Sequence, residues 1–240
     1  MLARDRYYQF LGEARGEDDL AALRRRFERS AQWYWCRLRR HLPGERGVPC
    51  LDIPCGSGNF LYFLQRQGYL KILGCDADPR QIERTAALEL PAVRRDAMEM
   101  LGDGTRTYGL ISSLDFIEHL SRDEALQFLA LCRGRLAPGG VLLLRTPSAD
   151  GPFGAHDVWN DMTHQWAMTS GVLEAVLEMA GYANIAILDE RPQPSNLFNT
   201  VRAAVFVPAR ALASIAVLAL GLTPPRIWSR AMWGIGYKPF

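Results

Sequence analysis

Residues 51–60, LDIPCGSGNF, are the most informative stretch of the chain. The apolar run that ends at Asp52 predicts a buried strand, and the segment from Asn59, NFLYFLQRQG, has helical spacing. A strand that turns within a few residues into a helix leaves backbone N–H groups at the helix start, where they suit a carboxylate or phosphate. Gly56 and Gly58 let the chain turn and let a ligand approach the backbone. The stretch therefore predicts a ligand-binding loop at the end of a strand.

Outward from this loop, short apolar runs alternate with helix-like segments. Strands are predicted at 48–53, 71–77, 92–96, 108–116, 141–146 and 184–189, and helices at 59–68, 79–89, 123–137 and 169–180. This alternation predicts an α/β protein with a Rossmann-like, doubly wound, mostly parallel sheet of about seven strands and helices on both faces. In such sheets ligands bind at the carboxyl ends of the strands.

Three regions are expected along the chain. Residues 1–46 form an N-terminal helical extension, because leucines and aromatic residues recur there at helical spacing. Residues 47–192 form the core, and a polar and aromatic insertion at 147–168 should fold over the strand ends as a lid. Residues 193–240 form an apolar C-terminal segment with a helix.

An apolar run covers residues 203–222, AAVFVPARALASIAVLALGL. Pro208 and Arg210 interrupt it and leave about a dozen clean residues, where a spanning helix needs roughly 20. We expect a buried C-terminal helix that does not span a bilayer. The alternative is a segment that makes peripheral contact with a membrane surface or a lipid-carried substrate.

Charge and cysteine content set limits on the partners and the compartment. The net charge of +2 is too small to indicate a nucleic acid, so the arginines of residues 24–40 are interpreted as a solvated helix face. The five cysteines form no CxxC pair, and the charged N-terminus resembles no signal peptide. We expect a cytoplasmic protein, either soluble or peripheral at the inner face of the membrane.

Acidic residues narrow the choice of ligand. The loop lacks the G-x-G-x-x-G pattern of dinucleotide sites, which would need a glycine at Asn59. Asp76 ends the second strand, 18 residues beyond Gly58, where a carboxylate accepts hydrogen bonds from ribose hydroxyls. Asp96 closes the third strand, placed to accept from an adenine amino group. The ligand is therefore an adenosine-bearing cofactor.

Five motifs follow one another along the chain: LDIPCGSGNF, GCDADPRQIE, RRDAME, ISSLDFIEHL and LAPGGVLLL. With them, residues 48–190 resemble a class I S-adenosylmethionine-dependent methyltransferase. The resemblance implies S-adenosyl-L-methionine as cofactor, with Asp76 at the ribose, Asp96 at the adenine, and Ser113 and Leu114 beside the sulfonium. It extends the cofactor site to Asp52, Pro54, Cys55, Gly56, Gly58, Ala77, Asp78 and Ala97.

Pro54 stands where the loop of such enzymes has its first glycine. A proline lacks the N–H donor but keeps its carbonyl, which in this family accepts from the methionine ammonium. Cofactor binding is therefore expected to survive the proline.

Methyl transfer to oxygen usually needs a base for the hydroxyl proton, and histidine suits this near neutral pH. His156 and His164 in the insertion, and His119 after the fourth strand, are the candidates. His156, Asp157, Asp161 and His164 also offer ligands for a divalent ion, but lid loops commonly carry such residues without metal, so no metal is expected.

The stretch HDVWNDMTHQWAMT, followed by LEAVLEMAGY, is similar to methyltransferases of bacterial surface polysaccharide and glycolipid synthesis. It implies O-methylation of a carbohydrate or glycolipid, with a small molecule or a lipid-linked glycan as acceptor and no nucleic acid. The alternatives are a quinone or phenol O-methyltransferase, a catalytically degenerate cofactor-binding partner protein, and a dehydrogenase.

Overall fold

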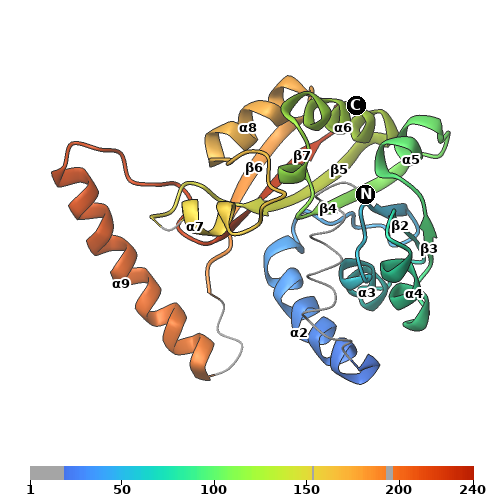
Figure 1. The fold of residues 1–240 in the computed structure, drawn as a ribbon, viewed down its shortest axis with the longest axis horizontal. Coiled ribbons are helices and arrows are strands. Elements are labelled where there is room, and N and C mark those ends of the chain that lie inside the picture. Colours follow the sequence, from blue (N-terminus) through green and yellow to red (C-terminus); the bar gives the residue numbers. More distant parts are fainter. Residues whose placement is uncertain (1–18, 153, 193–196) are drawn as a thin grey trace.

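The computed structural model describes residues 19–152, 154–192 and 197–240. They form a sheet of seven strands in the order β3-β2-β1-β4-β5-β7-β6 (Figure 1). The strands are β1 Pro49–Asp52, β2 Lys71–Asp76, β3 Ala92–Arg94, β4 Tyr108–Leu114, β5 Leu136–Pro147, β6 Ala183–Asp189 and β7 Ala231–Tyr237. β7 pairs antiparallel with β5 and β6, and the other pairs are parallel. The predicted mostly parallel Rossmann-like sheet is confirmed.

Helices cover both faces of the sheet, as predicted. Side chains of α5, α6 and α8 share one apolar cluster with the sheet, and those of α2 and α3 share another. The helices between residues 59 and 179 are α3 Asn59–Arg66, α4 Pro79–Ala87, α5 Ala97–Asp103, α6 Arg122–Arg135, α7 Gly154–Trp159 and α8 Ser170–Met179, with a short 3-10 helix at Ile117–His119. α6 begins with a capping box, in which Ser121 and Glu124 each bind the other's backbone amide.

The predicted N-terminal extension contains α2, Leu20–Leu38, which packs along α3. Its buried side chains recur every three or four residues and include Phe27 and Tyr34, while the arginines at 24, 25, 26 and 29 are exposed. The interpretation as a solvated helix face is confirmed for these four arginines, but it is wrong for Arg37, which is partly buried with its guanidinium over the Trp33 ring. The part of the predicted extension at residues 1–18 lies outside the described residues.

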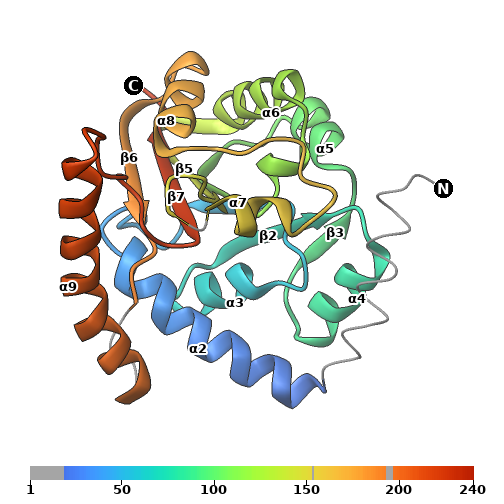
Figure 2. The same cartoon turned by 60° about the vertical axis from the view of Figure 1, so that its left-hand side comes forward.

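The C-terminal region corrects the sequence-based expectation. The apolar helix exists as α9, Leu197–Ala219, but none of its residues is buried, so the expected buried helix is wrong. Both faces of the sheet are already covered by other helices, and α9 stands beside them (Figures 1 and 2). Pro208 lies inside the helix without ending it, and α9 is the one helix of the described ranges that is long and apolar enough to cross a membrane.

The core does not end at residue 192, because β7 lies within its sheet. Two glycines of β7 hide the strand from sequence reading, since glycine is rare in strands. A Cβ on Gly234 would lie 2.9 Å from Leu173 Cδ2, and one on Gly236 would lie 2.9 Å from Tyr182 Cβ. The glycines therefore let α8 and the segment after it pack directly on this strand.

Candidate functional site

The loop after β1 is fixed by its own backbone at the carboxyl ends of the strands. The Ile53 amide donates to the Ser112 carbonyl at 2.8 Å, and the Cys55 amide donates to the Cys75 carbonyl at 2.9 Å. These two bonds connect the loop to β4 on one side and to β2 on the other. The predicted cofactor loop thus lies at the sheet edge where doubly wound proteins bind their ligands.

The two glycines of this loop have different tasks. Both have positive φ, +51° at Gly56 and +85° at Gly58, a region that other residues rarely adopt. A Cβ on Gly58 would lie 2.9 Å from Leu90 Cδ1 and 3.0 Å from Thr85 Cγ2, whereas one on Gly56 would meet no atom within 4 Å. Gly58 therefore permits close packing at the start of α3, and Gly56 leaves the backbone open toward a ligand.

Asp76 holds the loop in place. Its Oδ2 accepts from the Gly56 amide at 2.9 Å, and its Oδ1 accepts from the Asp78 amide at 2.9 Å. Partial burial raises the pKa of Asp76, although the two amides act in the opposite direction. A carboxylate has about four acceptor positions, so the predicted binding of ribose hydroxyls is compatible with these bonds.

Asp96 and Asp78 begin helices. Asp96 Oδ1 accepts from the amides of Met98 at 2.8 Å and Glu99 at 3.2 Å, and thereby caps α5. Asp78 caps α4 in the same way. Both aspartates thus have a structural role beside the predicted one, and the exposed Asp96 side chain remains accessible to an adenine.

Asp52 and the two serines of β4 form the floor of the site. The buried Asp52 accepts from the Ser112 hydroxyl at 2.6 Å, and burial raises the pKa of Asp52 to about 7. Ser113 Oγ is also buried, and it has no hydrogen-bond partner within the described part of the chain. An unpartnered buried hydroxyl is costly unless a ligand binds it, which agrees with the predicted position of Ser113 beside the cofactor.

The remaining predicted cofactor residues surround this floor in the order of their strands. Pro54 and Leu114 are partly buried after β1 and at the end of β4, and Cys55 is buried beneath the loop. Ala77 is exposed after β2, and Ala97 is buried at the start of α5. Their proposed cofactor contacts remain predictions.

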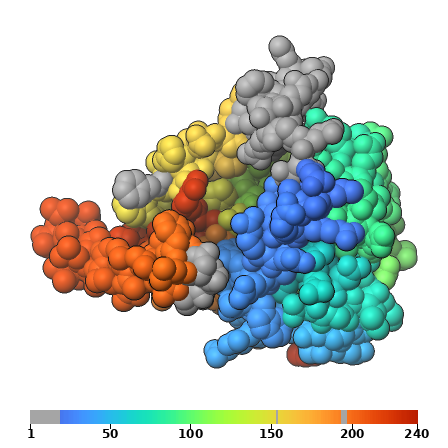
Figure 3. All heavy atoms as spheres, turned by 90° about the horizontal axis from the view of Figure 1, so that it is seen from below, coloured from blue at the N-terminus to red at the C-terminus, as the bar shows by residue number. Residues whose placement is uncertain are grey.

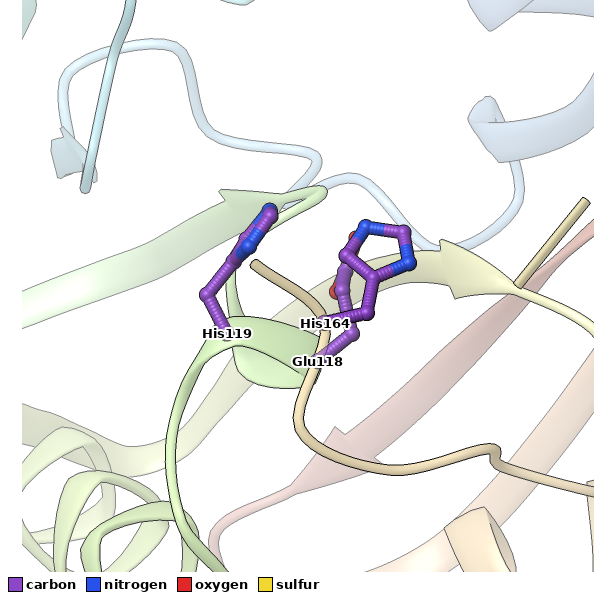
Figure 4. Close-up of side chains that lie close together, drawn as sticks. All are labelled: Glu118, His119 and His164. Atoms are coloured by element: carbon purple, nitrogen blue, oxygen red, sulfur yellow. The ribbon is translucent and has the colours of Figure 1, made fainter. Parts of the chain in front are cut away.

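A second group of side chains lies just after β4. Glu118, His119 and His164 each offer a ligand atom within 4.8 Å of the others, and the rings of His119 and His164 meet edge to face with centroids 4.7 Å apart (Figure 4). Two come from the short 3-10 helix and one from the insertion. The structure thus joins two of the three predicted catalytic histidines.

Hydrogen bonds assign the protonated nitrogen of both rings. His119 Nδ1 lies 2.8 Å from Thr163 Oγ1, and that hydroxyl donates to Asp161 Oδ1 at 2.6 Å, so Nδ1 is the donor. His164 Nδ1 donates to the Val158 carbonyl. When each ring is neutral, this leaves its basic lone pair on Nε2. Burial and the neighbouring His164 lower the pKa of His119, so this ring is neutral at pH 7 and can accept a proton.

Glu118 is the buried member of the group. Its Oε2 accepts from Thr146 at 3.0 Å, while Oε1 has no partner in residues 19–152, 154–192 and 197–240. Burial, and secondarily the charge of Asp115, raise the pKa of Glu118 to about 8. The raised pKa favours the neutral form of Glu118 near pH 7, in which it can donate a proton, and once deprotonated it could hold a divalent ion together with the two imidazoles.

His156 is not part of this group. It is exposed on α7, and its neighbour Asp157 accepts from Arg230 Nε at 2.7 Å. The metal-ligand set considered from the sequence is therefore not assembled, because Asp157 binds Arg230 and Asp161 binds Thr163. The group that could hold an ion includes Glu118 and His119 instead, and of that set it retains only His164.

Sequence reasoning missed Arg145 and its two carboxylates. Arg145 on β5 binds Asp115 at the end of β4, and its Nε donates to Glu190 Oε1 at 2.5 Å beyond β6. Asp115 and Glu118 flank Phe116 and Ile117 in the motif ISSLDFIEHL, from which only Ser113, Leu114 and His119 were predicted as site residues. The spacing of Asp115 and Glu118 could have identified these two carboxylates from the sequence. No local pattern predicts that Arg145 pairs with Asp115 and Glu190.

The insertion 147–168 is attached to the segment after β4, as its predicted lid position requires. The Gln165 amide donates to the Glu118 carbonyl at 2.8 Å, and Trp166 Nε1 donates to the Ile117 carbonyl at 3.3 Å. Trp166 is buried and pins the lid, whereas Trp159 is 57% exposed.

Residues 24–187 match the model of the methyltransferase domain family, and the chain belongs to this family. The fold is that of S-adenosylmethionine-dependent methyltransferases. A solved structure of one from Archaeoglobus fulgidus superposes with a TM-score of 0.65 and 22% identity, covering 92% of this chain and 100% of that one. Phosphoethanolamine N-methyltransferase 2 of Haemonchus contortus, solved with S-adenosyl-L-methionine, has a TM-score of 0.58 and 15% identity, covering 87% and 53%.

Curated relatives include the tRNA U34 carboxymethyltransferases of Azotobacter vinelandii, 29% identical over 170 residues, and of Pseudoalteromonas translucida, 26% identical over 173 residues. Each alignment covers 66% of this chain and 52% of the relative, so the chain spans about half the length of these proteins. S-adenosylmethionine is the cofactor of the family, and the open Gly56 backbone and the buried Ser113 hydroxyl fit it. The relatives' names give no support to the predicted exclusion of nucleic acid.

Proposed function

We propose that this protein is an O-methyltransferase that methylates a hydroxyl of a carbohydrate or glycolipid. The observation that carries the proposal is the pair of imidazoles beside the cofactor floor. Each has its proton fixed on Nδ1 and its lone pair on Nε2, so each can take the proton of a hydroxyl. A hydroxyl nucleophile needs such a base, whereas a neutral amine or a thiolate needs none.

The chain's residues divide the work as follows. Bound S-adenosylmethionine supplies an electrophilic methyl group on its sulfonium. Asp76 and the Gly56 backbone hold the cofactor loop, and His119 or His164 removes the acceptor proton as the oxygen attacks. Thr163 and Asp161 keep the His119 ring oriented and stabilise it when protonated. The lid residues bound to the 3-10 helix limit access of water.

Two surface features support the choice of acceptor. Trp159 and Met162 on the lid are 57% and 65% exposed close to His164 in sequence, and such apolar faces suit a sugar ring. The exposed apolar helix α9 suits an acceptor carried on a lipid. The same helix would also suit a prenylated quinone, so the acceptor class must be read from the product.

The test is incubation of the purified protein with S-adenosylmethionine carrying a labelled methyl group, together with fractionated bacterial envelope. We expect label in a glycan or glycolipid as an alkali-stable methyl ether. Label only in a quinone or phenol fraction would overturn the proposal that the acceptor is a carbohydrate or glycolipid. Binding of S-adenosylhomocysteine without transfer to any fraction would favour the degenerate binding protein.

A second candidate substrate is RNA, which the names of the curated relatives and the exposed arginines of α2 favour. Total tRNA should therefore be included as a parallel acceptor, with mass analysis of its nucleosides. A labelled methylated nucleoside would replace the proposed glycan by tRNA. Glycan labelling without any tRNA product would remove this candidate.

A further inference from the structure

The helix α9 carries apolar residues on its solvent-exposed side, where a soluble surface helix carries polar ones. The residues that are half-buried share one side, and they include Arg210, whose guanidinium is 3.4 Å from Asp189. The opposite side carries a stripe of apolar residues at intervals of three, four or seven positions. This outer stripe consists of Leu197, Val201, Val205, Leu212, Ile215 and Leu218, each more than half exposed. A stripe of this size on a monomer indicates a binding surface.

The charge around α9 indicates what covers the outer stripe. Residues 191–240 contain five arginines, one lysine and no aspartate or glutamate. Four of these arginines pair with carboxylates outside that segment: Arg191 and Arg210 with Asp189, Arg226 with Glu174 and Arg230 with Asp157. α2, with its exposed arginines, and α9 both reach the face of the molecule that Figure 3 shows. The charge argument therefore rests on the exposed arginines of α2, including Arg24, Arg25 and Arg29. A second copy of the chain would bring these like charges together, whereas anionic phospholipid headgroups complement them. The occupant favoured by charge is a bilayer with anionic lipids.

Topology excludes a helix that spans this bilayer while the sheet stays intact. The 23 residues of α9 reach about 34 Å, enough for a hydrocarbon core of about 30 Å. However, the amide of Ile227 is bound to Asp150, and the amides of Trp228 and Ser229 are bound to Asp189. The seven residues 220–226 reach at most about 25 Å when fully extended, too short to cross back. Both ends of α9 therefore stay on one side.

We propose that α9 is an in-plane membrane anchor, with its outer stripe among the acyl chains of an anionic bilayer and the arginines of the chain at the headgroups. The anchor is connected to the lid. Arg230, in the segment that returns from α9 to β7, donates to Asp157 of α7. A membrane-bound α9 thus places the lid near lipid-carried molecules. The proposal does not depend on which acceptor is methylated.

Vesicle flotation of the full chain tests the surface. We expect binding to vesicles of phosphatidylcholine with phosphatidylglycerol and weaker binding to phosphatidylcholine alone. Val205→Asp or Ile215→Asp should lower partitioning of the protein onto anionic vesicles roughly ten-fold or more. Each variant removes apolar contact with the acyl chains and adds a negative charge that the anionic headgroups repel. Leu70→Asp, at a position 82% exposed outside α9, is the matched control and should float like the wild type. S-adenosylhomocysteine binding by each variant reports that it is folded.

Fluorophore labelling distinguishes an α9 that lies in the plane of the membrane from one that crosses it. In a Cys36→Ser background the other four cysteines are buried, so a new cysteine is the accessible one. Labels at 201, 205, 212 and 215 should all lie at one shallow depth, and labels at 203 and 213 should be closer to water. Depth that changes steadily along the helix would overturn the in-plane anchor. Absence of vesicle binding, or self-association that depends on the outer stripe, would overturn the membrane as occupant.

Discussion

At the scale of single residues, Asp76 is where structure and expected binding coincide. Its carboxylate accepts from the Gly56 and Asp78 amides, so removing it should loosen the loop and also delete the predicted acceptor for the ribose hydroxyls. We expect Asp76→Ala to weaken S-adenosylhomocysteine binding more than ten-fold in calorimetry. Pro54→Gly should stay within a few-fold, because the carbonyl at position 54 is retained. A large loss with Pro54→Gly and none with Asp76→Ala would contradict the assigned roles.

The two lid histidines offer a second test at this scale. His164 meets His119 beside Glu118, and His156 is exposed on α7. With an acceptor in hand, His164→Asn should lower kcat about 100-fold while the affinity for S-adenosylhomocysteine stays unchanged. His156→Asn should leave kcat and the affinity for S-adenosylhomocysteine within about two-fold of the wild type. The reason is that His156 touches neither the pair of histidines His119 and His164 nor the cofactor floor. Equal losses in the two variants would show that the pairing seen here is irrelevant to catalysis.

At the scale of elements, the sequence predicted what local pattern can encode. The alternation of apolar runs identified β1 to β6, and helical spacing identified the helix predicted at 123–137, which is α6. Prediction from the sequence pattern failed for β7, because its Gly234 and Gly236 are explained only by the side chains that pack on them. It also failed for the pairing of His119 with His164, because ring contact between segments 45 residues apart in sequence has no local signature.

Glycine substitutions test the packing of the elements. Gly58→Ala adds a Cβ at φ +85°, within 3.0 Å of both Leu90 and Thr85, so it should lower the free energy of unfolding by about 1–3 kcal/mol. Gly134→Ala is the matched control, because it lies inside α6 with open space around the new Cβ. It should raise the free energy of unfolding by about 0.5–1 kcal/mol. Urea unfolding measures both, and two equal effects would contradict the packing argument.

At the scale of the whole molecule, two buried carboxyls make stability depend on pH. The pKa values of Asp52 and Glu118 are raised to about 7 and about 8 in the folded chain, well above those of unfolded chains. Between roughly pH 4.5 and 7 the unfolded state has lost these protons and the native state has kept them. The free energy of unfolding should therefore fall as pH rises through this window.

The variant Glu118→Gln isolates one of these protons. The difference in the free energy of unfolding between Glu118→Gln and the wild type should shift in favour of the variant as pH rises from 5 to 8, by up to roughly 1.4 kcal/mol per pH unit. Urea unfolding at several pH values measures the difference. Glu83→Gln, at an exposed position, should run parallel to the wild type. A Glu118→Gln curve that also runs parallel would show that the buried carboxyl is ionised in the native protein.

The position of β7 has a consequence for synthesis. β6 pairs in the sheet with β7, and β7 also pairs with β5, so β6 joins the sheet through a strand that the ribosome makes later. α9 lies between them in the chain and is complete before the sheet can close. A nascent chain therefore completes the long apolar helix α9 before the strand through which β6 joins the sheet. Early contact of α9 with a lipid surface would shield it from aggregation during this interval.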